Sequence, residues 1–210
     1  MLRKYTIYGE RCSGTNYLEN IMDLNFDVEI TWEFGWKHFF GFHDEVLRNH
    51  SDDTLFICII RDPVDWFNSL YRELHHLPLK YEKNLSEEEK LKKFLNEEMD
   101  RNMYTGEPYK SIFELRHTKI NWLVEELPKK VKNYIIIRYE DMLHNFSSTL
   151  HKIKDKGLKV KSNIEFPINT TTYRNTKGSI YRKKMNSIPS EVILNDNRFI
   201  KFYEDKFYPR

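Results

Sequence analysis

The stretch that most constrains the fold lies at the start of the chain, where a short strand, a loop bounded by glycines and a helix follow one another. Residues 4–8 alternate as a strand does, and apolar residues at helical spacing begin after Thr15. Gly9 and Gly14 have the spacing of the first and last glycines of a P-loop. Because a helix N-terminus presents backbone N–H groups and a positive dipole end, this loop is suited to bind a phosphate-like anion.

Two residues distinguish this loop from the loop of a P-loop NTPase. Such a loop needs a lysine that reaches the β- and γ-phosphates, followed by Ser or Thr to hold magnesium. Those positions are Thr15 and Asn16 here. The loop is therefore expected to bind an anion without the groups for metal-assisted phosphoryl transfer. The only cysteines are Cys12 and Cys58, so we expect neither a disulfide framework nor a metal site.

Strands and helices alternate along the rest of the chain. The apolar, β-branched runs at 54–60 and 133–138 are typical of strands buried on both faces of a parallel sheet. A further strand is expected at 25–30 and loops at 31–43 and 163–185. Helical segments are predicted at 15–23, 44–49, 63–75, 87–99, 111–127, 140–156 and 189–205. The pattern predicts an α/β fold of three layers, α/β/α, with a central parallel sheet.

The chain of 210 residues is long enough for one α/β domain, and no linker or repeat divides it. We therefore expect a single domain over 1–210. The segment 86–108 begins with a charged helix that has few apolar residues, and we interpret this segment as a lid or insertion.

The charge balance excludes a global electrostatic field, because 34 basic residues face 32 acidic ones. Neither a nucleic acid nor a membrane is expected as a partner, and any anion site must be built locally. No apolar run approaches the roughly 20 residues of a membrane span. Residues 1–4 lead directly into the first strand and leave no room for a signal peptide, so a cytoplasmic location is expected.

A second candidate anion-binding group follows the apolar strand 54–60. Arg61 must turn its charge toward a partner there, since an unpaired charge cannot stay buried. Ser69 lies eight residues later, about two turns into the next helix. Parallel sheets bind ligands beyond the carboxyl ends of their strands. Arg61 and Ser69 could therefore meet the glycine loop around a second phosphate; the alternative is a salt bridge from Arg61 to Asp62 or Asp65.

Four motifs, in this order, resemble those of the PAPS-dependent sulfotransferases, where PAPS is 3′-phosphoadenosine 5′-phosphosulfate. Ser13-Gly14-Thr15-Asn16-Tyr17 stands where the family's 5′-phosphosulfate loop has Ser-Gly-Thr-Thr-Trp. Lys37-His38 resembles the family's Lys-x-His, and His38 precedes Arg61 by 23 residues. Residues 61–71, Arg-Asp-Pro-Val-Asp-Trp-Phe-Asn-Ser-Leu-Tyr, look like the family's 3′-phosphate motif. Tyr139-Glu140-Asp141 resembles its Tyr-Glu-Asp, whose tyrosine lies near the adenine.

The resemblance implies a P-loop-NTPase-like sulfotransferase architecture and transfer of a sulfuryl group from PAPS to a hydroxyl or amine, with a carbohydrate among the acceptors considered. It implies that the donor is held by Cys12, Ser13, Gly14, Thr15, Asn16, Tyr17, Arg61, Ser69 and Tyr139. It also implies His38 as general base and Lys37 as the cation that stabilises the transferring group. His43 is the alternative base, and Glu33 is a further one.

The chain departs from the family pattern at two places. Cys12 stands where the family has Lys or Arg, and we expect Arg11 to supply that cation unless it pairs with Glu10. The family's C-terminal Arg-Lys-Gly run has its nearest counterpart in Lys177-Gly178, which we predict to close over the 3′-phosphate. Other candidates for that role are Arg174 and the basic run 182–184.

Two other functions stay open. A P-loop kinase or NTPase is favoured by the glycine spacing and opposed by Thr15; a non-catalytic nucleotide-binding module is favoured by Cys12. For a sulfotransferase we expect a small molecule or a glycan as the acceptor, and the oligomeric state is not predicted. The aromatic residues of the loop 31–43 could stack on a sugar or a small aromatic, or could be core: Trp32, Trp36, Phe39, Phe40 and Phe42.

Overall fold

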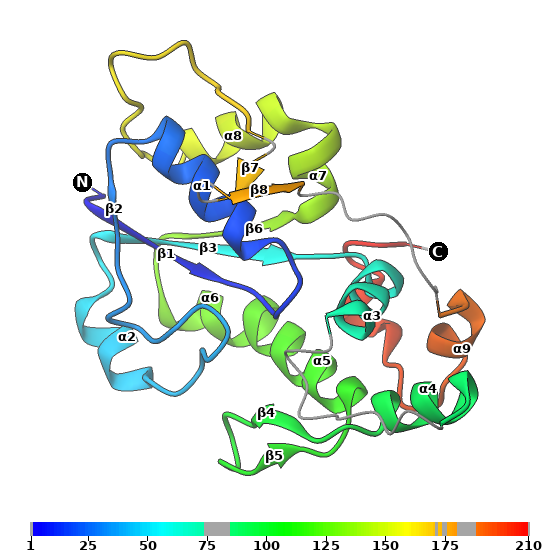
Figure 1. Ribbon diagram of the computed structural model, residues 1–210. Helices are drawn as coiled ribbons and strands as arrows, with labels where there is room; N and C mark the ends of the chain where they lie inside the picture. The colour runs from blue at the N-terminus through cyan, green and yellow to red at the C-terminus, as the bar shows by residue number, and fades with distance from the viewer. Residues whose placement is uncertain (1, 74–84, 171, 174–175, 180–187, 210) are drawn as a thin grey trace.

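A parallel sheet of four strands lies at the centre of the computed structural model, which describes residues 2–73, 85–170, 172–173, 176–179 and 188–209. The strand order is β2-β1-β3-β6 (Figure 1). The strands are β1 (Lys4–Tyr8), β2 (Glu29–Ile30), β3 (Thr54–Ile60) and β6 (Tyr134–Arg138). The predicted α/β fold with a central parallel sheet is confirmed.

The register of the strands brings three chain segments to one edge of the sheet. Tyr8 of β1 pairs with Cys58 of β3, and Ile60 of β3 pairs with Arg138 of β6. Every residue of β3 is buried, as its continuous apolar run predicts. The chain therefore leaves the carboxyl edge of the sheet within a few residues of Gly9, Arg61 and Tyr139.

Helices cover both faces of the sheet (Figure 1). One face carries α1 (Thr15–Asn25), α7 (Tyr139–His144) and α8 (Phe146–Lys154). The other carries α2 (Asp44–His50), α5 (Ile112–Asn121) and α6 (Leu127–Lys130). Side chains alternate along β3, so that Ile57 packs with Leu18 and Met142 on the first face while Phe56 packs with Leu123 on the second.

A third apolar cluster lies beside the sheet and joins α3 (Pro63–Arg72), α4 (Glu87–Leu95) and α9 (Ser190–Leu194) to α5. The segment 86–108 belongs to it: α4 is followed by a hairpin of β4 (Met99–Arg101) and β5 (Pro108–Tyr109). Phe94 and Tyr109 are fully buried there. The single domain and the lid or insertion role of this segment stay predictions.

Two predicted helices end earlier than expected. The helix predicted over 87–99 ends at Leu95, where the side chain of Asn96 donates to the carbonyl of Lys92 and caps the last turn. The helix predicted to reach residue 75 is α3, whose assigned span ends at Arg72, and residues 74–75 lie outside the described part of the chain.

Other predicted helices and strands are continued, divided or shortened in the structure. The helix 111–127 continues to Lys130 through a π-helical turn, Trp122–Glu126. The helix 140–156 is divided at Asn145, and the last helix consists of α9 and α10 (Lys201–Glu204). The strand 25–30 is reduced to β2. β7 (Thr172–Tyr173) and β8 (Thr176–Ser179) pair as a hairpin in a segment that was predicted to be a loop. The prediction missed these strands because the segment lacks the alternation of apolar and polar residues that marks a strand.

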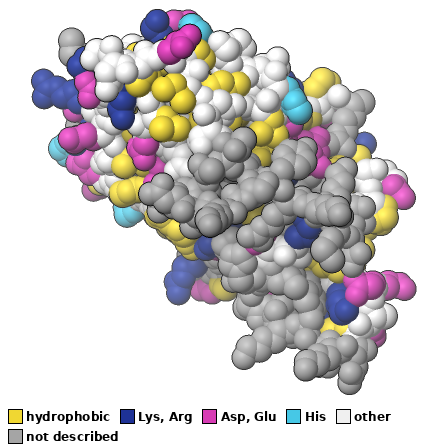
Figure 2. Space-filling view, turned by 45° about the horizontal axis from the view of Figure 1, so that its top comes forward, with side chains coloured by type: hydrophobic (Ala, Val, Ile, Leu, Met, Phe, Trp, Pro, Cys, Tyr) yellow, Lys and Arg dark blue, Asp and Glu magenta, His cyan; other side chains and the backbone are white. Residues whose placement is uncertain are grey.

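Charged side chains of both signs are interspersed on the described part of the face shown in Figure 2. Ion pairs between partly or fully exposed side chains include Lys132–Asp52 and Lys206–Glu125. Among the described helices, none has the length and apolar character needed to cross a bilayer.

Candidate functional site at the carboxyl edge of the sheet

The backbone conformation of the loop after β1 requires glycine at two positions. A Cβ on Gly9 would lie 2.8 Å from the carbonyl oxygen of Ile59, and Gly14 has a φ of 98°. Between them, Cys12 also has a positive φ, 62°. Ser13 closes the turn, since both its N–H and its hydroxyl donate to the carbonyl of Glu10, at 3.2 and 2.7 Å.

The N-terminus of α1 opens at the end of this loop. Gly14 is its N-cap and no side chain caps it, and the first intrahelical hydrogen bond runs from Leu18 N–H to the Gly14 carbonyl at 3.0 Å. The N–H groups of Thr15, Asn16 and Tyr17 precede that bond and have no carbonyl within the helix to bind. This end of α1 can therefore bind an anion through backbone donors and the helix dipole.

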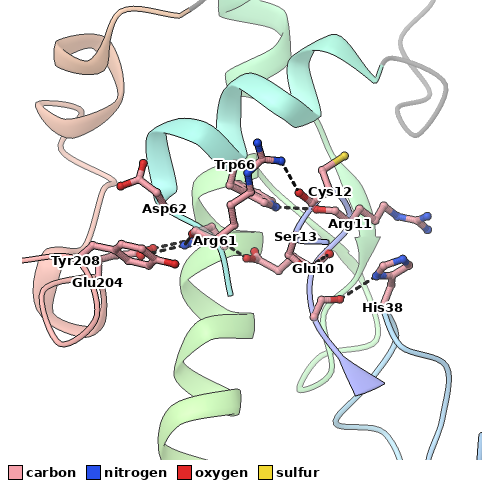
Figure 3. Close-up of polar contacts among 12 residues, drawn as sticks. Glu10, Arg11, Cys12, Ser13, His38, Arg61, Asp62, Trp66, Glu204 and Tyr208 are labelled. Carbon is pink, nitrogen blue, oxygen red and sulfur yellow. Dashed lines mark hydrogen bonds and ion pairs between the residues drawn. The ribbon is translucent and has the colours of Figure 1, made fainter. Parts of the chain in front are cut away.

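Arg61 reaches the loop from the end of β3 (Figure 3). Its Nη1 donates to the carbonyl of Cys12 at 3.0 Å, and its guanidinium lies 4.9 Å from the ring centroid of Tyr139. Its Nε is buried without a hydrogen-bond partner among the described residues. The structure thus brings Arg61 to the glycine loop, as predicted, with donor capacity left over for a ligand.

Cys12 lies between Arg61 and α3. Burial raises the pKa of its thiol to about 12, with the charge of Glu73 adding to the shift, while Arg61 and a hydrogen bond from Ser69 oppose it. Ser69 thus comes to the loop as expected, where its hydroxyl binds the thiol. A thiol that stays protonated at neutral pH is neither a cation nor a nucleophile.

Arg11 turns away from Glu10 and pairs with Asp100 of β4. Its Nε and Nη2 donate to Oδ1 of Asp100 at 3.2 and 3.1 Å. The guanidinium lies 5.4 Å from the ring centroids of both Trp36 and Phe39. The alternative of an Arg11–Glu10 pair is wrong, because Glu10 pairs with Arg116 instead.

Lys37 and His38 both flank the loop. Lys37 Nζ contacts Oδ1 of Asn16 and lies 2.9 Å from Oε2 of Glu19, so a cation stands at the first turn of α1. Nδ1 of His38 lies 2.8 Å from the carbonyl oxygen of Gly9. Because a carbonyl accepts only, Nδ1 carries the hydrogen and Nε2 is left as the acceptor of a neutral ring.

The environment keeps His38 neutral. Burial lowers its pKa to about 3, the charges of Arg11, Lys119 and Lys37 lower it as well, and the hydrogen bond to Gly9 opposes the shift. The edge of the ring meets Trp36, whose centroid is 4.7 Å away. His38 is thus a buried neutral imidazole among three cations, a setting in which a bound anion would favour protonation.

Tyr139 and Tyr17 line the side of the loop that faces α7. Tyr139 is buried against Gly14, and its ring meets that of Tyr17 edge-on at 6.4 Å between centroids. The hydroxyl of Tyr17 and Oδ1 of Asn169 lie 2.8 Å apart. Of the C-terminal candidates, Lys177 and Gly178 lie in β8, and their side-chain surroundings are outside the described structure. Arg174 and the basic run 182–184 lie outside the described residues altogether.

Several polar residues to which the sequence reasoning assigned no role hold this edge together. Glu140 accepts the N–H of Asp62 at 3.0 Å through Oε1 and the hydroxyl of Tyr208 at 2.8 Å through Oε2, which fixes the chain after Arg61. On α5, Arg116 and Lys119 are buried. The sequence feature that could have indicated their burial is their position next to Leu115 and Ile120, which are apolar residues of the same amphipathic helix.

No family model matches the sequence, and no curated protein is significantly similar to it. Among solved structures, the chain is similar to mouse sulfotransferase SULT7A1 complexed with PAP, with 17% sequence identity and a TM-score of 0.44. The match covers 73% of this chain and 57% of that chain.

Proposed function

We propose that this protein is a PAPS-dependent sulfotransferase that transfers a sulfuryl group to a hydroxyl or amine. The observation that carries the proposal is the hydrogen bond from Arg61 Nη1 to the carbonyl of Cys12, at 3.0 Å. It joins residues 49 positions apart. Arg61 opens the motif that resembles the family's 3′-phosphate motif, and Cys12 directly precedes the one that resembles its 5′-phosphosulfate loop. Their convergence at the carboxyl edge of a parallel sheet is what a shared ligand requires.

The residues at this edge fit a ligand with two separated anionic groups. The N–H groups of Thr15, Asn16 and Tyr17 at the start of α1 would hold the 5′-phosphosulfate. Arg61, with a buried Nε that lacks a partner among the described residues, would hold the 3′-phosphate, assisted by Ser69 and by Lys177-Gly178 of β8. When bound, PAPS supplies the sulfuryl group and leaves as the bisphosphate.

The missing P-loop lysine is consistent with this chemistry. Lys37, which contacts Asn16 at the first turn of α1, places a cation close to where an anion would bind. A sulfuryl group carries less charge than a phosphoryl group, so fixed cations and N–H donors can stabilise its transfer without a metal ion. Cys12 stands where the family has a basic residue, and we propose that Arg11, beside the same loop, supplies that positive charge.

His38 is the proposed general base. Its Nε2 is the acceptor nitrogen of a neutral ring, and nearby lie the exposed indoles of Trp32 and Trp36. These faces suit a ring-shaped acceptor, a sugar or a small aromatic, that presents its hydroxyl to His38. The cytoplasmic location stays a prediction.

Thermal shift tests the proposal. Adenosine 3′,5′-bisphosphate (PAP) at about 100 times its Kd should raise the Tm by about 5 °C or more, while ATP with magnesium should not. Transfer of labelled sulfate from PAPS to a panel of phenols and glycans is then the direct assay. Stabilisation by ATP with magnesium alone would favour the kinase or NTPase function. Binding of PAP by the wild type without transfer to any acceptor would favour the non-catalytic nucleotide-binding module.

Two variants extend this test. If transfer occurs, Arg11→Ala should lower kcat while PAP still binds, and unchanged turnover would remove Arg11 from the reaction. The matched control is Arg198→Ala, because the guanidinium of Arg198 pairs with Asp196, contacts Asn96 and lies over the ring of Phe113.

A further inference from the structure

Two buried cations stand one helical turn apart on α5. Arg116 and Lys119 are each only 2% exposed. Residues three apart on a helix share a face, so both side chains point to the same side of α5. Burying two such charges is unfavourable unless each is fully paired, and a purely structural position would be served as well by apolar side chains.

Arg116 binds both strand ends from which the glycine loop and the Arg61 motif begin. Its Nη1 donates to Oε2 of Glu10, directly after the first loop glycine, at 2.5 Å. Its Nη2 donates to the carbonyl of Arg61 at 2.7 Å. Two further hydrogen bonds reach the C-terminal segment, where Nε and Nη2 donate to the carboxylate of Glu204 at 2.7 and 2.9 Å.

Lys119 binds the two segments that carry the other proposed groups. Its Nζ donates to the carbonyl of His38 at 3.1 Å. The same Nζ lies 2.8 Å from Oδ2 of Asp100, whose Oδ1 accepts the guanidinium of Arg11. Lys119 thus holds His38 through its backbone and Arg11 through Asp100.

From these contacts we infer that Arg116 and Lys119 are positioning residues for the proposed sulfuryl transfer, an inference that rests on the proposed function. Arg116 aligns the parts that bind the nucleotide, the glycine loop and Arg61. Lys119 aligns the parts that act on the transferring group, His38 and Arg11. Neither side chain touches the substrate, and each acts through the residues it holds.

This division predicts different kinetic effects for the two residues. In Lys119→Met, Asp100 keeps Arg11 as a partner, so the fold should survive while His38 and Arg11 lose alignment. We expect kcat to fall by about 100-fold, the cost of a misplacement of about 1 Å, with the Kd of PAP within about 3-fold of the wild-type value. Lys132→Met is the matched control, since Lys132 is exposed and pairs with Asp52 at the surface.

For the other residue, Arg116→Lys keeps the charge but not the fork that spans Glu10, Arg61 and Glu204. We expect the Kd of PAP to rise by about ten-fold or more, as for the loss of one charge-assisted hydrogen bond. The matched control is Glu204→Gln, which weakens the same buried cluster without contacting either strand end. It should lower the Tm and leave the Kd of PAP unchanged.

NMR of the ligand-free protein separates this inference from the proposed function. If the wild type neither binds PAP nor transfers sulfate, the proposed function is wrong. The positioning is then read from the His38 ring signals, which should move in Lys119→Met but not in Lys132→Met. The amide signals of residues 10–14 should likewise move in Arg116→Lys more than in Glu204→Gln. Unmoved signals, or equal effects of variant and control on kcat and Kd, would overturn the inference.

Discussion

The ring of Tyr139 lies directly against Gly14, so close that a Cβ on Gly14 would stand 2.3 Å from Cδ2 of Tyr139. The two residues follow different strands, yet the contact joins the glycine loop to the start of α7. No side chain larger than a hydrogen atom fits at residue 14 unless Tyr139 moves. Since Arg61 also lies over Tyr139, such a movement would reach the proposed 3′-phosphate site.

Replacement of Gly14 by alanine should therefore destabilise the protein and impair nucleotide binding together. The left-handed conformation, with φ at 98°, costs an alanine about 1–2 kcal/mol, and displacement of Tyr139 adds to it. Gly106→Ala is the control, because φ there is also positive, 76°, and nothing lies within 4 Å of its added Cβ. Urea denaturation should show the larger loss for Gly14→Ala; equal losses would mean that Tyr139 yields without cost.

Nucleotide binding should raise the pKa of His38. In the free protein, burial and neighbouring cations lower this pKa to about 3. An anion at the loop would offset the charges of Arg11 and Lys37 and favour the protonated ring. Titration of the ring by NMR, with and without PAP, measures the shift. His38→Ala should then lose transfer while PAP affinity is kept, and unchanged turnover would assign the base to another residue.

Cys12 should react slowly with iodoacetamide in the folded protein. With a pKa of about 12, its thiolate fraction at pH 8 is about 1000-fold below that of an ordinary cysteine. Mass spectrometry after timed alkylation measures the rate, and the protein unfolded in urea is the control. Cys12→Ser should also retain transfer. Rapid labelling, or loss of transfer in that variant, would give the thiol a role in the reaction.

The sequence was sufficient to predict the sheet and the point where its motifs meet. The run 54–60 is apolar without interruption, which places β3 at the centre, and the polar residues after each strand must then lie at one edge. The approach of Arg61 to the glycine loop was predicted from this topology, with a salt bridge to Asp62 or Asp65 as the alternative. It is confirmed by the contact with the carbonyl of Cys12.

The ion pairs behind that edge could not be predicted. Glu10 meets Arg116 across 106 residues, and Arg11 meets Asp100 across 89. Such pairs depend on how α5 and the β4–β5 hairpin dock against the sheet, and local periodicity has no information on docking. For the same reason the sequence offered only Glu10 as an alternative partner for Arg11, because Glu10 is adjacent in the chain, whereas its carboxylate turns toward α5 and pairs with Arg116.

Glu10 should make the folding stability depend on pH. Burial raises the pKa of its carboxyl to about 7, with the charge of Glu204 adding and Arg116 opposing, and one of its oxygens has no hydrogen-bond partner among the described residues. Because the folded state holds this proton more tightly than the unfolded chain, Glu10 destabilises the fold progressively as pH rises from about 4.5 to 7. At about 1.4 kcal/mol per pKa unit, the loss is about 3 kcal/mol.

The variant Glu10→Gln isolates this effect, because glutamine still offers Arg116 an oxygen and does not titrate. His38, whose pKa is lowered, gives a slope of the opposite sign between about pH 3 and 6.5 and is common to both proteins. The difference in unfolding free energy between Glu10→Gln and the wild type, from urea denaturation, should therefore grow between pH 4.5 and 7. Glu125→Gln is the control, since the hydrogen bond from Lys206 lowers the pKa of Glu125. Any effect of Glu125 on the pH dependence of stability therefore lies below pH 4.5. A flat difference for Glu10→Gln would mean that Arg116 keeps this carboxylate ionised throughout.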